Sequence, residues 1–249
     1  GGLGKLGLAI NETVAELNGN LFLLDLPGKN FDKMNNHLKK ISNIKIKNIK
    51  CDLSDDKERN KIIQEFKNSK IKLDVLINNA AFTGSSDLDG WNNKFDRQSI
   101  STFEKALSLN LTSAFHLTQG LYENLNQGRN GSIINISSIY GFLSPDYSLY
   151  KGTNMNVPAA YSASKGGLLQ LTRWLASTCA PNVRVNSVSP GGILNNQNKN
   201  FIKRYNNKTL LNRMANPEDF KGIIAFLSSN LSSYVTGQNF IIDGGLSIK

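Results

Sequence analysis

Short apolar runs alternate along the chain with longer stretches of helical periodicity. The runs lie at residues 21–24, 45–49, 73–77, 132–136, 183–188 and 240–242. Strands that alternate with helices are typical of βαβ units, whose parallel strands are covered by helices on both faces. The pattern therefore predicts an α/β fold with a doubly wound parallel sheet in three α/β/α layers. Residues 1–249 show no repeat and no linker, which predicts a single domain.

Two helix starts carry capping signals. Ser101 is followed three residues later by Glu104, which predicts a capping box with Ser101 as the N-cap residue. An apolar stripe follows it over residues 107–118. Asn216 and Pro217 likewise predict an N-cap and a proline in the first helical turn.

Composition and charge exclude several classes of protein. Apolar residues make up 39% of the chain and charged residues 19%, as in ordinary globular proteins. No run reaches the roughly 18 apolar residues of a membrane helix, so we expect no membrane association. The net charge of +10 suggests nucleic acid, but the cations are not interleaved with aromatic side chains, so we expect no nucleic-acid partner. Two distant cysteines, Cys51 and Cys179, indicate a reducing, cytoplasmic location and no metal site.

Three glycines open the chain with regular spacing. Gly1, Gly4 and Gly7 allow a tight turn and a close approach of the backbone to a pyrophosphate. The amphipathic stretch that follows, up to about residue 18, offers the amide groups of a helix N-terminus to that ligand. Such a turn normally follows a strand, so we expect the first strand of a Rossmann-type sheet upstream of Gly1.

Polar residues follow the next three strands at the edge where open α/β sheets bind ligands. Asp25 ends the strand at residues 21–24, where a carboxylate suits a ribose 2′-hydroxyl and repels a 2′-phosphate. This favours NAD over NADP, although Asp25 also suits a simple turn and Lys29 lies nearby. Asp52 and the pair Asn78-Asn79 follow the two later strands.

The strongest chemical signal is Tyr161, followed four residues later by Lys165. Positions i and i+4 share a helix face, and a nearby ammonium favours the phenolate form of a tyrosine. Tyr161 therefore suits general acid/base chemistry. Ser138 ends the strand at residues 132–136 with a hydroxyl suited to a carbonyl oxygen.

With these motifs in this order, the chain resembles the single-domain branch of the short-chain dehydrogenase/reductases over essentially its whole length. The resemblance rests on Gly1 to Gly7, Asp25, Asp52, Asn78-Asn79-Ala80, Asn110, Ser138, Tyr161 with Lys165, Ser189-Pro190-Gly191 and Asp243-Gly244-Gly245.

The resemblance implies an NAD(H)-dependent oxidoreductase that interconverts an alcohol and a ketone or aldehyde by hydride transfer. In that family, Tyr161 exchanges the proton, Lys165 lowers the tyrosine pKa and holds the nicotinamide ribose, Ser138 orients the carbonyl, and Asn110 positions a water. The implied cofactor-binding residues are Gly1, Gly4, Lys5, Leu6, Gly7, Asp25, Leu26, Asp52, Leu53, Asn79, Ala80, Ala81, Tyr161, Lys165, Pro190, Gly191, Ile193 and Asn195. Family members form homodimers or homotetramers, here through the helices starting near Ser101 and Tyr161.

Two departures from the family pattern bear on the substrate. Lys5 replaces a glycine of the turn, whose spacing resembles the sugar-nucleotide-modifying branch and leaves an epimerase or dehydratase open. Tyr161 lies 23 positions after Ser138, so residues 142–159 form an insert beside the site. The insert is also similar to members in bacterial surface-sugar pathways, such as those for nonulosonic acids.

The segment at residues 193–216 corresponds to the family's substrate lid. Its five cations and absence of acids predict an anionic substrate such as a phosphorylated or nucleotide-linked sugar, although a solvated lysine-rich loop fits equally. A neutral carbonyl or 3-oxoacyl thioester substrate, and a silent NAD-binding regulatory protein, also remain open. The predicted substrate-binding residues are Tyr140, Tyr147, Lys151, Asn196, Lys203, Arg204 and Arg213.

Overall fold

Six parallel strands form the centre of the described part of the chain. The computed structural model describes residues 1–84 and 86–249. Each predicted apolar run forms a strand whose ends differ from the prediction by two residues at most. The strands are β1 (Leu21–Asp25), β2 (Ile46–Lys50), β3 (Val75–Asn78), β4 (Gly131–Ile136), β5 (Val183–Pro190) and β6 (Asn239–Ile242).

The strands pair in two groups, ordered β1-β2 and β3-β4-β5-β6, and every pair is parallel. In the described part of the chain, β1 and β3 are not hydrogen-bonded to each other, and a cavity of about 680 Å³ is lined by both. The expected strand upstream of Gly1 is not tested by this arrangement and stays a prediction.

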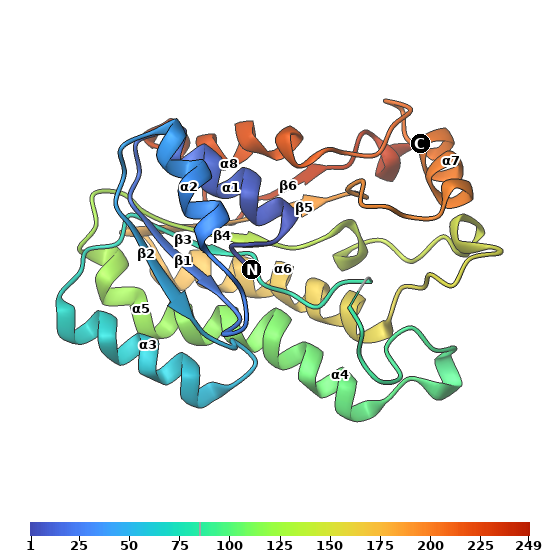
Figure 1. Ribbon diagram of the computed structural model, residues 1–249, viewed down its shortest axis with the longest axis horizontal. Coiled ribbons are helices and arrows are strands. Elements are labelled where there is room, and N and C mark those ends of the chain that lie inside the picture. Colours follow the sequence, from blue (N-terminus) through green and yellow to red (C-terminus); the bar gives the residue numbers. More distant parts are fainter. Residues whose placement is uncertain (85) are drawn as a thin grey trace.

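Helices cover both faces of the strands, which confirms the three-layer α/β/α architecture (Figure 1). One layer holds α1 (Lys5–Glu16), α2 (Asp32–Ile41) and α8 (Lys221–Leu227). The other holds α3 (Asp56–Ser69), α4 (Ile100–Leu107), α5 (Ser113–Asn126) and α6 (Ala159–Cys179). The helix α7 (Lys199–Lys208) stands apart from both layers, close to the C-terminus (Figure 1).

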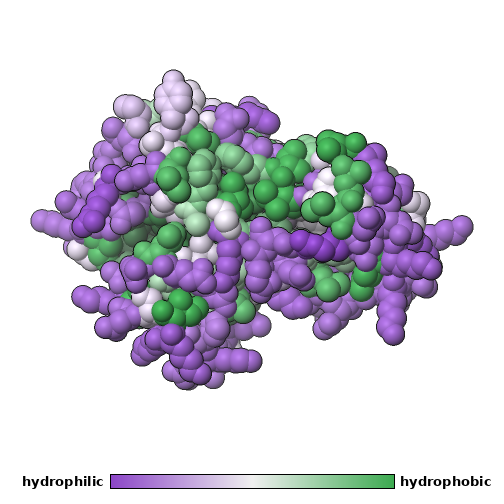
Figure 2. Space-filling view, turned by 90° about the horizontal axis from the view of Figure 1, so that it is seen from above, coloured by the Kyte–Doolittle hydropathy of each residue, from purple (hydrophilic) through white to green (hydrophobic). Residues whose placement is uncertain are grey.

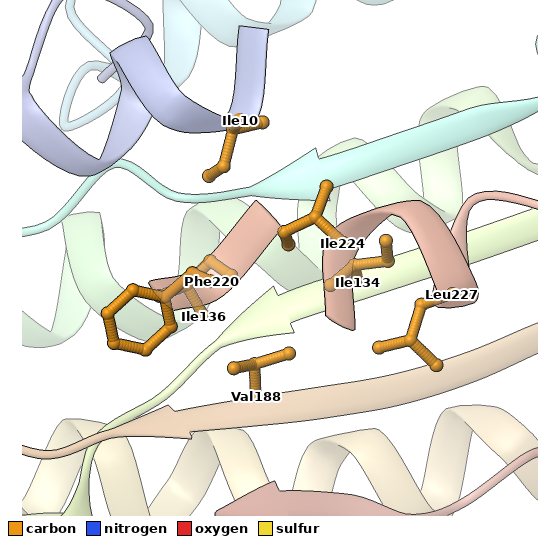
Figure 3. Packing of buried hydrophobic residues seen from close by; sticks show 7 residues of the cluster. All are labelled: Ile10, Ile134, Ile136, Val188, Phe220, Ile224 and Leu227. Carbon is orange, nitrogen blue, oxygen red and sulfur yellow. The ribbon is translucent and has the colours of Figure 1, made fainter. Parts of the chain in front are cut away.

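A fully apolar cluster joins the sheet to the α1 and α8 layer (Figure 3). Ile134 and Ile136 point to this face of β4, while Ile133 points to the opposite face and packs against α6. Strands buried on both faces need apolar residues at successive positions, which explains the continuous runs in the sequence. The residues of the cluster are Ile10, Ile134, Ile136, Val188, Phe220, Ile224 and Leu227.

The capping prediction at Ser101 is wrong by two residues. Helix α4 begins at Ile100, and its N-cap is Ser99, whose hydroxyl accepts a hydrogen bond from the Thr102 amide at 3.3 Å. Both serines are able to cap, and the chain uses the one nearer the preceding loop. The prediction at Asn216 is confirmed. Asn216 forms a capping box around Pro217 in the 3-10 turn Pro217–Phe220, which leads into α8.

On the face that Figure 2 shows, hydrophilic side chains surround apolar ones that gather toward the middle. Among the described residues, no helix combines the length and the apolar character needed to cross a bilayer.

Candidate active site

A cavity of about 700 Å³ gathers most of the predicted site at one edge of the sheet. Its wall comes from the glycine turn, the ends of β3, β4 and β5, the start of α6, and the lid. Parallel strands place their carboxyl ends together, which is why residues distant in sequence meet here. The predicted residues on this wall are Gly1, Gly4, Lys5, Leu6, Gly7, Asn79, Ala80, Ala81, Ser138, Tyr140, Tyr161, Lys165, Pro190, Gly191, Ile193, Asn195 and Asn196.

The glycine turn presents free amide groups to this cavity. In the described part of the chain, the backbone N–H groups of Lys5, Leu6 and Gly7 have no backbone acceptor, and all three residues line the cavity. A Cβ atom on Gly7 would lie 2.3 Å from the Gly1 carbonyl oxygen, so only glycine lets α1 approach the turn this closely. Free amides at a helix N-terminus suit a pyrophosphate, so this edge fits a dinucleotide cofactor.

Four predicted cofactor residues do not line the cavity: Asp25, Leu26, Asp52 and Leu53. Asp25 is buried at the end of β1, where its carboxylate accepts hydrogen bonds of 2.8 Å from the amides of Leu3 and Leu26. Burial opposes ionisation, but the hydrogen bonds from these amides hold the pKa of Asp25 below its usual value. Asp25 is therefore a carboxylate that supports the glycine turn.

Asp52 lies in a turn of its own at the end of β2. Its carboxylate accepts hydrogen bonds from the amide and the hydroxyl of Ser54, at 2.9 and 2.7 Å. Its backbone amide donates to the Glu58 carboxylate at 2.6 Å. These contacts order the loop that leads into α3.

Tyr161, Lys165 and Ser138 meet at the centre of the cavity wall. The two residues of α6 share a face, and Lys165 Nζ lies 5.9 Å from the centre of the Tyr161 ring. Lys165 is 3% exposed, and its ammonium donates to the carbonyl oxygen of Ile136 at 2.7 Å. Ser138 follows β4 directly. The three residues predicted to carry the proton chemistry are therefore brought together.

Burial dominates the protonation of this group. It raises the pKa of Tyr161, against a hydrogen bond with the Ser138 hydroxyl that lowers it. Burial also lowers the pKa of Lys165 to about 7. The phenol is thus protonated at neutral pH. The lowering of the tyrosine pKa by Lys165, which the family resemblance implies, stays a prediction.

Asn110 lies behind the cavity in a π-helical turn, Ser108–Thr112, between α4 and α5. Its amide nitrogen donates to the Ser164 hydroxyl at 3.0 Å and to the Phe82 carbonyl at 3.2 Å, and its oxygen accepts from the Phe82 amide at 2.8 Å. π turns concentrate at functional sites. Here the turn fixes Asn110 between α6 and the loop after β3.

The lid cations predicted to bind substrate do not line the cavity. Arg204 donates to the carbonyl oxygens of Leu149 and Lys151, at 3.1 and 2.5 Å. Arg213 forms a two-pronged salt bridge with Asp219, at 2.6 and 2.8 Å. The side chains of Tyr147, Lys151 and Lys203 are exposed and also lie outside the cavity wall.

The cavity also contains residues that the sequence analysis did not assign to the site. Tyr150, Met155, Phe201, Tyr205 and Met214 line it from the insert and the lid. The length of the insert could have indicated Tyr150 as a residue of the cavity wall, because residues inserted next to Ser138 and Tyr161 must pack near them. The apolar spacing of Phe201 and Tyr205, four residues apart on α7, was the signal for the lid.

The fold thus places a serine, a tyrosine and a lysine in one cavity with a glycine turn, at the carboxyl edge of a parallel sheet. A family model described as "Enoyl-(Acyl carrier protein) reductase" matches residues 4–247. The chain belongs to the short-chain dehydrogenase/reductase family, whose members act on CH–OH groups.

Similar proteins are known from several bacteria. The 3-oxoacyl-[acyl-carrier-protein] reductase of Aquifex aeolicus is 29% identical, over 97% of this chain and 92% of that protein. Post-translational flagellin modification protein A of Campylobacter coli is 27% identical, over 98% and 95%. The crystal structure of a short-chain dehydrogenase from Leptospira borgpetersenii with bound NAD+ has a TM-score of 0.84 and 34% identity, over 100% and 91%.

Proposed function

We propose that the protein is an NAD(H)-dependent oxidoreductase that interconverts an alcohol and a ketone or aldehyde, with Tyr161 as the general acid/base. The observation that carries the proposal is the meeting of Tyr161, Lys165 and Ser138 on a cavity whose other end is the glycine turn. A single cavity thus holds proton-transfer groups and a pyrophosphate-binding turn.

Each residue of the cavity wall has a separate role in the proposed reaction. When bound, the nicotinamide cofactor supplies or accepts the hydride. Ser138 donates a hydrogen bond to the substrate oxygen, and Tyr161 gives that oxygen its proton during reduction and removes it during oxidation. The amides of Lys5, Leu6 and Gly7 would bind the pyrophosphate. Lys165, beside Tyr161, would bind the nicotinamide ribose and take part in the proton transfer.

NAD is the preferred cofactor in this proposal. Asp25 is ionised and lies at the end of β1, directly behind the glycine turn. Each carboxylate oxygen keeps a lone pair beyond its backbone bond, so it can accept from a ribose hydroxyl. The same charge repels the 2′-phosphate of NADP. The bound NAD+ of the Leptospira relative supports this choice.

The substrate end of the cavity favours a neutral, hydrogen-bonding molecule such as a sugar. Among the described residues that line the cavity, the charged side chains are those of Lys5 and Lys165, and both belong to the cofactor and catalytic parts. Because Arg204 and Arg213 are held by other partners, the anionic-substrate hypothesis loses its proposed clamp.

The test follows NADH absorbance with a panel of sugars and sugar-derived ketones, each in neutral and phosphorylated form. We expect turnover that falls about 10²–10⁴-fold in Tyr161→Phe, the usual contribution of a general acid. Turnover that survives this substitution unchanged contradicts the mechanism. Turnover confined to phosphorylated members contradicts the neutral pocket.

A second candidate is the reduction of a 3-oxoacyl thioester, which is favoured by the name of the Aquifex relative. Acetoacetyl-CoA in the same NADH assay distinguishes the two, because this candidate predicts rapid turnover of the thioester and none of the sugars.

A further inference from the structure

Two partly buried tyrosines form a hydroxyl pair on the substrate side of the cavity. Tyr140 lies in the 3-10 turn Ile139–Gly141, and Tyr150 ends the 3-10 turn Tyr147–Tyr150 of the insert. Their phenol oxygens are 2.5 Å apart. The Tyr140 amide donates to Ser138 Oγ at 3.2 Å, which places the Tyr140 backbone beside that serine, and both phenols lie close enough to Tyr161 to interact with it electrostatically. Both tyrosines line the cavity together with Tyr161.

The pair has one hydrogen-bond donor left over. Two phenols carry two O–H groups, and one of them is used in the bond between the tyrosines. Among the described residues, neither oxygen has another hydrogen-bond partner. Burial keeps both phenols protonated by raising their pKa values, to about 12 for Tyr150. The second proton and the remaining lone pairs are therefore available to a molecule in the cavity.

Two other polar side chains of the cavity wall, those of Gln197 and Asn198, are engaged with their own loop. Gln197 accepts from the Asn195 amide at 2.6 Å and donates to the Ile193 carbonyl at 2.7 Å. Asn198 caps α7 by accepting from the Asn200 amide. The tyrosine pair brings a neutral donor and acceptor to the same cavity wall as Ser138 and Tyr161.

The pair is also held firmly in place. The Tyr150 ring packs against Phe201 of α7, with ring centres 5.1 Å apart. Arg204 of the same helix binds the carbonyl oxygens of Leu149 and Lys151, on either side of Tyr150. A hydrogen-bonding group that is fixed before the ligand arrives loses little side-chain entropy on binding.

We infer that the Tyr140 and Tyr150 pair is a hydroxyl-binding subsite, and that the substrate carries a hydroxyl group on a carbon next to the reacting carbonyl or carbinol carbon. A hydroxyl both donates and accepts, which matches the donor and the lone pairs that the two phenols leave free. This inference rests on the proposed oxidoreductase function and specifies its substrate class as α-hydroxy ketones and vicinal diols.

The test compares 2-hydroxycyclohexanone with cyclohexanone in the NADH assay. A site built to bind a hydroxyl rejects the analogue that lacks it, because its polar groups are then left unpaired. We expect kcat/KM to favour the hydroxy ketone by about 100-fold in the wild-type protein. Tyr150→Phe and Tyr140→Phe each remove one phenol, and each should reduce this preference about tenfold or more, mainly through KM.

The same change at Tyr234, which is fully exposed and outside the cavity wall, is the matched control and should keep the preference. Circular dichroism checks that each variant is folded. If Tyr140→Phe does not fold, the test relies on Tyr150→Phe. An equal rate for both ketones, or a preference that survives both substitutions, overturns the subsite.

The failure of the subsite differs from the failure of the proposed function. Tyr161-dependent turnover without a preference overturns the subsite alone. No NADH oxidation with any ketone, or turnover that survives Tyr161→Phe, overturns the oxidoreductase mechanism and the subsite with it.

Discussion

In the proposed mechanism, Tyr161 sets the pH dependence of the reaction in each direction. Burial raises its pKa above the ordinary value near 10, so the phenol keeps its proton through neutral pH. Carbonyl reduction uses the protonated phenol, and we expect its kcat to stay level until the alkaline range and then fall. Alcohol oxidation uses the phenolate, so its kcat should rise with pH over the same range. Measured kcat profiles in both directions check this prediction.

Ser138 modulates that profile. Its hydrogen bond lowers the pKa of Tyr161, so Ser138→Ala should move both pH profiles to higher pH and reduce kcat. Profiles of the variant that overlay those of the wild-type protein contradict the contact.

Lys165 adds a pH-dependent term to stability. Its pKa is about 7 in the fold and about 10.4 in an unfolded chain. Between these values the unfolded chain binds more protons, so this residue makes the fold more stable as pH rises from 7 to 10. In Lys165→Met without cofactor, the rise in unfolding free energy over this range should be smaller than in the wild-type protein. Urea denaturation at several pH values measures it, and parallel curves for the two proteins contradict the burial of a charged lysine.

In the proposed function, the charge of Asp25 decides between NAD and NADP. Asp25→Asn keeps an oxygen for the Leu3 amide but removes the charge that repels a 2′-phosphate. We expect the ratio of kcat/KM for NADPH to that for NADH to rise about tenfold, which corresponds to about 1.4 kcal/mol. Asp32→Asn, an exposed acid at the start of α2, is the control. If the NADPH-to-NADH ratio of kcat/KM is unchanged in Asp25→Asn, other residues discriminate between NAD and NADP.

At the level of elements, α7 and the insert form one unit. Arg204 joins them through two carbonyl oxygens, and Lys208 forms a 2.9 Å salt bridge with Asp146. Leu149, Phe201, Tyr205 and Met214 pack into a shared apolar cluster. Arg204 and Lys208 therefore support the wall of the cavity from outside.

Arg204→Met tests this supporting role. Loss of the guanidinium leaves two carbonyl oxygens without their donor and loosens Tyr150, so KM should rise several-fold. The rise should be equal for neutral and phosphorylated substrates, whereas a phosphate clamp predicts a loss confined to phosphorylated ones. Lys199→Met, at the exposed first position of α7, is the control.

The sequence allowed prediction where a local pattern decides the structure. Tyr161 and Lys165 follow from helical spacing, and the strands follow from apolar runs that are buried on both faces. The partners of Arg204 and Arg213 were not predictable in this way. Arg204 binds carbonyl groups more than fifty residues earlier in the chain. Every residue type has a backbone carbonyl, so the residue types at these positions do not indicate the contact. The predicted N-cap residue of α4 was wrong for a related reason, because Ser99 and Ser101 both satisfy the local rule for an N-cap.

At the scale of the whole molecule, an apolar face on α5 and α6 predicts a homo-oligomer. Trp174 is 54% exposed, although it packs against Phe115 with ring centres 6.5 Å apart. A symmetric dimer pairs the same face of both subunits, so it would bury both rings without needing a second, different interface patch. Large aromatic side chains contribute strongly to such interfaces, so a charge at this position should separate the subunits.

We therefore expect the wild-type protein to be a dimer or tetramer by light scattering, and Trp174→Glu to shift it to a smaller species. Phe95→Glu changes another exposed aromatic residue, outside α5 and α6, and should leave the mass unchanged. Because Tyr161 and Lys165 lie on the same helix as Trp174, the KM of Trp174→Glu reports whether assembly steadies α6. A monomeric wild-type protein contradicts the prediction, and an unchanged mass in Trp174→Glu places the interface on another face.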